Sequence, residues 1–175
     1  MTFGWRILRL SGLALLGITA GLILMVRLAP MPPALWHIDP TSVQKAPKGN
    51  DFVLRPFGAA PDGADGIAAL YQGDAATLAL HLYQTAMAEP HTTMLDGDVT
   101  TGFFTVVQRS KWMGFPDVIS VRTSDAGPGR ASLAIWSRSR YGAYDWGVNR
   151  ARVERWLAAN QRFLVVPTTP PAASP

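Results

Sequence analysis

An uncharged apolar run near the start of the chain constrains its fold and location more than any other feature. Seventeen residues without a charge, LSGLALLGITAGLILMV, extend from Leu10 to Val26. As a helix they cover about 26 Å, close to the thickness of the hydrocarbon core of a bilayer. Arg9 and Arg27 bracket the run, where guanidinium groups reach the two interfaces, and Trp5 stands where an interfacial aromatic would. We therefore expect a transmembrane anchor over residues 6–28 that contacts membrane lipids.

The charges around this run predict its orientation. Arg6 and Arg9 precede the apolar residues, and only Arg27 follows them directly. The positive-inside rule then keeps residues 1–5 in the cytoplasm and exports the remaining chain. The alternative is a cleaved signal peptide, whose apolar region is usually about 7–15 residues long and ends at small residues. Thr19-Ala20-Gly21 supplies small residues, but the apolar run continues past them, which favours a retained anchor.

Two glycines within the anchor offer a packing face. Gly17 and Gly21 form a small-xxx-small pattern, which lets a second membrane helix approach closely. Glycine is also simply frequent in membrane helices, so both interpretations stay open. The helix-packing interpretation predicts an integral membrane protein as partner.

Composition excludes several classes of function. The chain has no cysteine, which excludes disulfides, thiolate nucleophiles and cysteine zinc sites. Residues 28–98 carry three basic and eight acidic side chains (−5), residues 99–175 carry ten and four (+6), and three N-terminal arginines complete the net charge of +4. The basic residues are scattered along predicted strands and a helix, without a Lys/Arg-rich run. We therefore expect no nucleic-acid binding.

The exported part divides by composition into three segments. Residues 29–50 are proline-rich and aperiodic, which predicts a linker that holds the domain off the bilayer. Residues 51–165 carry the periodic segments and form the predicted domain. Residues 166–175, PTTPPAASP with its preceding valine, predict a disordered or polyproline-like tail.

Within the domain the patterns predict an α+β fold. A helix over 75–88 has leucines at helical spacing and Asp74 as its N-cap. A second helix runs from Arg150 to about Phe163, with Val153 and Trp156 on an apolar stripe and the arginines opposite. Residues 51–57 predict a short edge strand, limited by Pro56. An antiparallel sheet of about four strands then packs on two helices, its strands lying over residues 91–95, 102–110, 117–123 and 130–140.

The sequence contains none of the common catalytic motifs. G-x-S-x-G, H-E-x-x-H and phosphate-binding glycine loops are all missing. The three histidines are scattered, and His81 in the first helix is more typical of a packing residue than of a base. We therefore expect no catalytic residue, no metal site and no cofactor, and we do not expect an enzyme.

The densest polar stretch is SRSRYGAYDWGVN, residues 137–149. Strand alternation places Arg138 and Arg140 on one face, about 7 Å apart, so an anion is needed between them. The candidates are Asp145 or Asp117, a lipid phosphate, or an acidic group of a partner. Asn149 after the turn predicts an N-cap of the last helix, with Val148 and Val153 as a hydrophobic staple.

Two groups of residues are therefore candidate sites. A partner- or anion-binding site comprises Arg109, Ser137, Arg138, Ser139, Arg140, Tyr141, Asp145, Asn149 and Arg150. The predicted hairpin KWMGFP carries Trp112, Met113 and Phe115, which either fold back on the core or contact a membrane or protein partner.

The stretches FFTVVQRSKWMGFPDVISVR and SRSRYGAYDWGVNRARVERWL resemble the bacterial and plastid family called domain of unknown function 1499. The resemblance covers roughly residues 75–157, and the matching positions are Ser137, Ser139, Arg140, Gly142, Asp145, Gly147, Val148, Asn149 and Arg150. Many members of the family carry a cysteine near the start of the domain that this chain lacks, so a role for that cysteine does not transfer. The resemblance implies an envelope location and adds no mechanism.

Together these features predict a single-pass protein of the bacterial inner membrane, with its N-terminus cytoplasmic and its domain in the periplasm. The expected role is an accessory or interaction module, as a subunit or assembly partner of an integral membrane complex. The alternative is a small periplasmic hydrolase, or a lipid- or anion-binding protein, that uses Arg138, Arg140 and Asp145.

Overall fold

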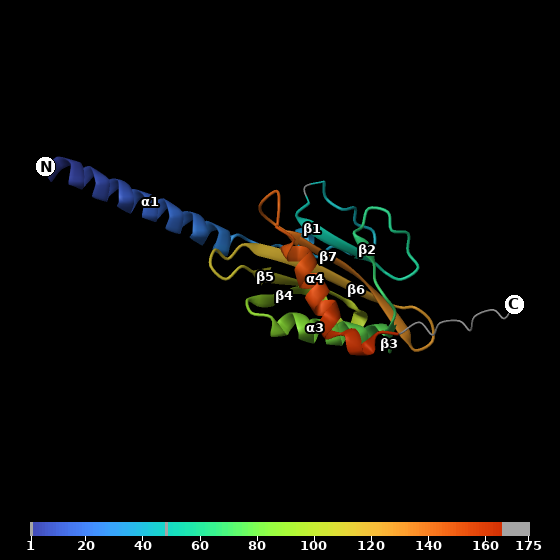
Figure 1. Cartoon of the computed structure of the whole chain (residues 1–175). Coiled ribbons are helices and arrows are strands. Elements are labelled where there is room, and N and C mark those ends of the chain that lie inside the picture. The colour runs from blue at the N-terminus through green and yellow to red at the C-terminus, as the bar shows by residue number, and fades with distance from the viewer. Residues whose placement is uncertain (1, 48, 166–175) are drawn as a thin grey trace.

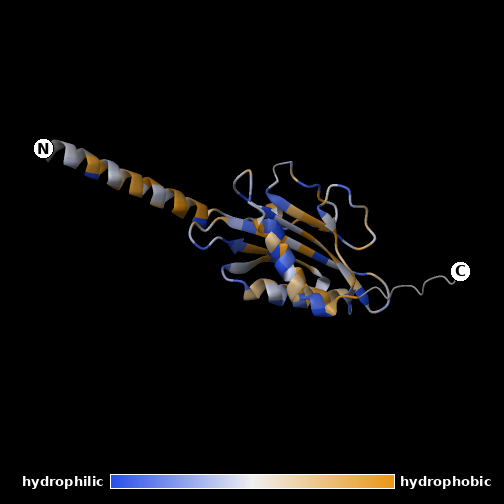
Figure 2. Cartoon of the chain, viewed as in Figure 1, coloured by the Kyte–Doolittle hydropathy of each residue, from blue (hydrophilic) through white to orange (hydrophobic). Residues whose placement is uncertain are grey.

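Helix α1, Thr2–Leu28, extends away from the rest of the molecule in the computed structural model, which describes residues 2–47 and 49–165 (Figure 1). Its stretch Leu8–Leu28 has a mean hydropathy of 1.9 and is long and apolar enough to cross a membrane. Apolar residues follow one another along this part of the helix (Figure 2). Gly17 and Gly21 lie on its exposed surface, with nothing within 4 Å of an added Cβ. A second helix against this face stays a prediction.

The domain is built on a sheet of seven strands, where about four were predicted. Its order is β2-β1-β7-β6-β5-β4, with β3 also paired to β7. All neighbours are antiparallel except β1 and β2. The strands are β1 Asp51–Arg55, β2 Gly66–Ile67, β3 Tyr71–Gln72, β4 Thr92–Asp98, β5 Phe103–Arg109, β6 Pro116–Asp125 and β7 Arg130–Ser139.

The prediction failed where strands are short or where an edge was inferred. Strands β2 and β3 have two residues each, too few for an alternating pattern to be read. Strand β1 is not an edge strand, because it lies between β2 and β7. The four longest strands, β4 to β7, follow the predicted segments to within a few residues.

Two helices cover one face of this sheet (Figure 1). Helix α3, Ala75–Ala88, has the predicted bounds, and the Asp74 side chain accepts a hydrogen bond from the Thr77 backbone N–H as its N-cap. Helix α4, Val148–Ala159, is followed by the 3₁₀ turn η2, Gln161–Phe163, so the single long helix that was predicted ends earlier. The largest side chains enclosed between helices and sheet are Tyr71, Leu78, Leu82, Phe104, Ile119, Leu133, Ile135 and Trp156.

The residues that follow α1 cover the opposite face of the sheet. Helix α2, Pro33–Trp36, starts this segment, which lies within the range predicted as a linker. The His37 ring stacks on Phe103 with centroids 3.9 Å apart. The buried Arg55 guanidinium donates to three backbone carbonyls of the segment, those of Pro40, Thr41 and Val43. The sheet is therefore covered on both faces. The predicted tail, residues 166–175, lies outside the described residues.

Candidate functional site

Strand β7 divides the predicted site between the two faces of the sheet. As strand alternation predicts, Ser137 faces helix α4 while Arg138 faces the segment that follows α1. The residues predicted as one site therefore belong to two groups of contacts that the sheet separates.

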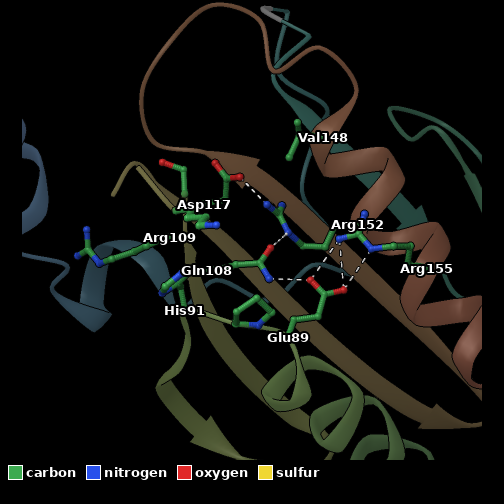
Figure 3. Close-up of a pocket in the computed structure, with 11 residues that line it drawn as sticks. Glu89, His91, Gln108, Arg109, Asp117, Val148, Arg152 and Arg155 are labelled. Carbon is green, nitrogen blue, oxygen red and sulfur yellow. Dashed lines mark hydrogen bonds and ion pairs between the residues drawn. The ribbon is translucent and has the colours of Figure 1, made fainter. Parts of the chain in front are cut away.

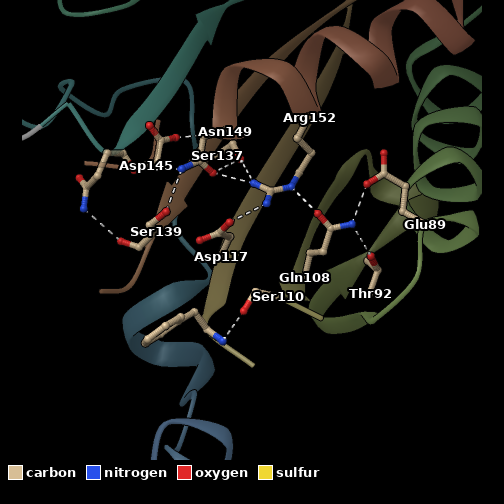
Figure 4. Close-up of polar contacts among 12 residues, drawn as sticks. Glu89, Thr92, Gln108, Ser110, Asp117, Ser137, Ser139, Asp145, Asn149 and Arg152 are labelled. Atoms are coloured by element: carbon tan, nitrogen blue, oxygen red, sulfur yellow. Dashed lines mark hydrogen bonds and ion pairs between the residues drawn. The ribbon is translucent and has the colours of Figure 1, made fainter. Parts of the chain in front are cut away.

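On the helix side, Asn149 connects strand β7, strand β1 and helix α4 (Figure 4). Its side chain is fully buried. The amide oxygen accepts hydrogen bonds from the Ser137 hydroxyl at 2.7 Å and from the Arg152 guanidinium at 2.6 Å. The amide nitrogen donates to the Ser139 hydroxyl and to the Asn50 backbone carbonyl, both at 3.0 Å.

The prediction of Asn149 as N-cap is therefore wrong. The N-cap is Gly147, whose φ of 78° suits glycine, and Asn149 lies within the first helical turn. The Asp145 carboxylate accepts the backbone N–H groups of Gly147 and Asn149 at 3.0 and 2.8 Å. It thus satisfies helix N–H groups and places negative charge at the positive end of the helix dipole. The predicted staple is also absent, because Val148 is exposed while Val153 is buried.

Arg152 is the central residue of this group, and the sequence prediction placed it on the wrong face. Its buried guanidinium donates to Asp117 at 2.5 Å and to Gln108 at 2.6 Å, besides Ser137 and Asn149. A usable signal existed: Arg152 stands next to Val153 and four residues before the buried Trp156, on the stripe that faces the sheet. Gln108 was not predicted either.

On the opposite face, Arg138 is buried without an ion pair among the described residues. Its guanidinium lies 3.7 Å from the centroid of the Trp136 ring and donates to the Trp36 backbone carbonyl at 2.6 Å. Burial lowers the pKa of Arg138 to about 10, and the Asp51 carboxylate opposes that shift. At neutral pH Arg138 is thus a buried cation.

The neighbouring Arg140 donates to the Pro30 backbone carbonyl at 2.6 Å and lies over the rings of Trp36 and Tyr141. The predicted counter-charges are not used, because Asp117 pairs with Arg152 and Asp145 caps helix α4. Both arginines instead bind carbonyl groups of the residues that follow α1.

The hairpin between β5 and β6 holds the end of α1 itself. Arg109 donates to the carbonyls of Gly114 at 3.0 Å and of Val26 at 3.4 Å, and the Val26 side chain is buried. Arg27 in turn donates to the Trp112 carbonyl at 2.9 Å. We call this set the junction: residues 26–36 with Arg109, Trp112, Arg138 and Arg140.

The hairpin does not fold back on the core, which was one of the two interpretations. Trp112, Met113 and Phe115 are all exposed, by 77%, 38% and 39%. The Phe115 ring meets the Tyr141 ring edge-on at 6.0 Å, which connects the hairpin to the loop between β7 and α4.

A hollow of about 500 Å³ lies beside the junction, between the α3–β4 connection, the ends of β5 and β6 that meet at the hairpin, and the first half of α4 (Figure 3). Glu89 and Gln108 lie on its wall with Asp117, Arg152 and Arg155. Burial alone would raise the pKa of Glu89, but hydrogen bonds from Gln108, Arg155 and Trp156 lower it below its ordinary value. The carboxylate is thus ionised at neutral pH and already fully engaged by donors.

The remaining predicted residues do not complete a reactive cluster. Arg150 is half exposed, pairs with Asp65 and Glu154 at 3.7 Å, and lies over the Phe52 ring. Neither the hollow in Figure 3 nor a second one between β1 and the end of α4 is lined by Arg138, Arg140 or Asp145. Within residues 2–47 and 49–165, no group of three or more His, Cys, Asp or Glu side chains could hold a metal ion.

Comparison with known proteins decides the family. The sequence profile of the family described as protein of unknown function (DUF1499) matches residues 38–159. The chain belongs to this family. The match confirms the resemblance and extends it toward the N-terminus, into the residues that lie across the sheet after α2. No curated protein and no solved structure matches the chain significantly.

Proposed function

We propose that this DUF1499 protein is a single-pass, membrane-anchored accessory domain of the bacterial envelope, with no catalytic activity of its own. The observation that carries the proposal is the junction. Four hydrogen bonds from arginines join residues 26–36 to the sheet end and hairpin: Arg27 to Trp112, Arg109 to Val26, Arg138 to Trp36 and Arg140 to Pro30. A domain joined in this way keeps a fixed position on the end of its apolar helix.

The length of the apolar run supports a retained helix over a cleaved signal peptide. A signal peptide is removed from the mature protein, and its apolar region is usually about 7–15 residues long. Here the uncharged run has seventeen residues and continues past Gly21 to Val26. Helix α1 is unbroken over the same residues, and its last turn contacts the hairpin.

The orientation follows from the flanking charges. With arginines concentrated before the apolar run, the N-terminus is cytoplasmic and the domain periplasmic. The role is then to present the domain at a fixed place on the outer side of the inner membrane, next to an integral membrane protein that packs on the Gly17 and Gly21 face.

Two measurements on the full-length chain test this proposal. Intact mass spectrometry of the membrane fraction should give the mass of the uncleaved chain, 18.9 kDa. A mature species that begins after Gly21 would refute the anchor. Alkaline phosphatase fused after residue 165 should be active, because that enzyme folds only outside the cytoplasm; an inactive fusion with full expression would refute the topology.

The partner face is tested by site-specific photo-crosslinking in the membrane. A probe at Gly21 should crosslink to a membrane protein, which is then purified with the chain in gentle detergent. A probe at Thr19, on the opposite side of the helix, should not crosslink to it. Equal capture from both positions would contradict a specific helix-packing face.

A further inference from the structure

Three aromatic side chains form an exposed group at the end of the domain that carries the junction. Trp146 is 95% exposed, Trp112 is 77% exposed and Tyr144 is 76% exposed, more than any other large hydrophobic side chain described after Leu28. Indole and phenol rings are amphipathic, and neither fits well in open water. We call these three residues the aromatic rim.

The aromatic rim comes from two loops that the structure holds together. Trp112 belongs to the β5–β6 hairpin, and Tyr144 and Trp146 belong to the loop between β7 and α4. The contact between the Phe115 and Tyr141 rings joins the two loops. The Trp112 carbonyl accepts a hydrogen bond from Arg27, so this member of the rim lies beside the last turn of α1.

The backbone holds Trp146 outward at a cost. Its φ is 56°, a left-handed conformation that glycine or asparagine adopts readily and tryptophan rarely. Such strain persists only where the surroundings determine it. Here Asp145 determines it, because its carboxylate holds the N–H groups of both Gly147 and Asn149. Strained backbone conformations cluster at functional sites, including those that contact ligands.

Two cations flank the rim, and Asp145 within the β7–α4 loop carries a negative charge at the start of α4. Lys111 and Arg27 lie beside the rim and form no ion pair among the described residues. The nearby carboxylates are occupied, Asp117 by Arg152 and Asp145 by the start of α4. Exposed Trp and Tyr together with Lys and Arg are the side chains that proteins place at a membrane–water interface, where they meet anionic phosphate groups.

The position of the rim selects lipid over protein as the occupant. The apolar helix ends at Leu28, and the hydrocarbon core it would span is about 30 Å thick, with headgroup regions that bring the bilayer to about 40–45 Å. The Trp112 backbone carbonyl accepts a hydrogen bond from Arg27, one residue before the end of the apolar helix. Trp112 therefore lies at the depth of the headgroups.

We infer that the aromatic rim, with Lys111 and Arg27, is a lipid-contact surface that inserts into the anionic headgroup region and holds the domain against the bilayer. This inference rests on the proposed membrane anchor. It specifies the ligand class as anionic phospholipid and the contact as interfacial. The domain then has a second attachment to the membrane besides α1.

The test uses the full-length chain in vesicles without any other protein. Because the chain has no cysteine, single cysteines can be introduced as W146C or W112C and labelled with an environment-sensitive fluorophore. S124C is the matched control, because Ser124 is exposed near the far end of β6. The vesicles contain phosphatidylcholine with or without phosphatidylglycerol, and a quencher is attached to the lipid headgroups.

We expect a blue-shifted, headgroup-quenched signal from positions 146 and 112 and a water-like, unquenched signal from position 124. Phosphatidylglycerol should increase the quenching, and K111Q should reduce that increase. Water-like signals from 146 and 112 in chain that floats with the vesicles would overturn the inference and leave the anchor intact. Chain that does not float with vesicles would overturn the anchor as well.

Discussion

Replacing Arg152 by alanine tests the buried polar group under helix α4. The Arg152 side chain is 3% exposed and donates to Asp117, Gln108, Ser137 and Asn149. Alanine would leave the Asp117 carboxylate, 15% exposed, without its counter-charge. Removing one partner of a buried ion pair costs roughly 3–5 kcal/mol, because the remaining charge stays desolvated. That is a large part of the ~5–15 kcal/mol that stabilises a typical domain.

Arg155 provides the matched control, since it is the same residue type on the same helix. Its side chain is 57% exposed and pairs with Glu89 at 3.2 Å. An exposed pair contributes about 0–1 kcal/mol, so Arg155→Ala should change stability little. The two variants thus differ mainly in burial.

The assay is thermal unfolding of the full-length chain in mild detergent, followed by near-ultraviolet circular dichroism. At about 3 °C per kcal/mol for a chain of this size, Arg152→Ala should lower Tm by roughly 9–15 °C and Arg155→Ala by at most about 3 °C. Equal shifts for the two variants would refute the assignment of Arg152 as the buried centre of this group.

Three further predictions concern other parts of the molecule. Gly97→Ala should destabilise far more than Gly127→Ala in the same melting assay, because both glycines have positive φ but only a Cβ at Gly97 would lie 2.4 Å from the Phe103 carbonyl oxygen. The free energy of unfolding should fall as pH drops below about 4. Burial would raise the pKa values of Asp39 and Glu89, but hydrogen bonds hold both below their ordinary values, so the stability that the ionised groups contribute is lost as they protonate in the folded protein. A melting temperature that does not change over this acid range would contradict this. Arg138→Ala should increase hydrogen exchange at residues 33–38 in membranes, whereas Arg130→Ala, at the exposed start of β7, should not.

The sequence predicted the elements that repeat a local pattern. Helix α3 has leucines at helical spacing and an aspartate cap, and both signals agree with its structure. Strand β7 alternates as predicted, with serine and arginine on opposite faces. Such features depend on neighbours in the chain, so they can be read without knowing the fold.

The parts that failed depend on distant backbone groups. Arg138, Arg140 and Arg55 donate hydrogen bonds to backbone carbonyls of residues 30–43. Every residue carries a backbone carbonyl, so the sequence does not reveal which of them an arginine contacts. The counter-charge to the arginines was therefore sought among carboxylates. Asn149 was misread for a similar reason, because asparagine is equally suited to a cap and to a buried four-way contact.

The central claim is that the junction fixes the domain on the end of its membrane helix. The most direct measurement is the distance distribution between spin labels at L28C and S124C, by pulsed electron resonance on the full-length chain in lipid nanodiscs. Both positions are exposed, and the chain has no other cysteine. We predict a single narrow distance distribution for the chain with an intact junction. The double variant Arg138→Ala, Arg140→Ala should broaden that distribution. A broad distribution in the unmodified junction, as from a flexible linker, would contradict the account.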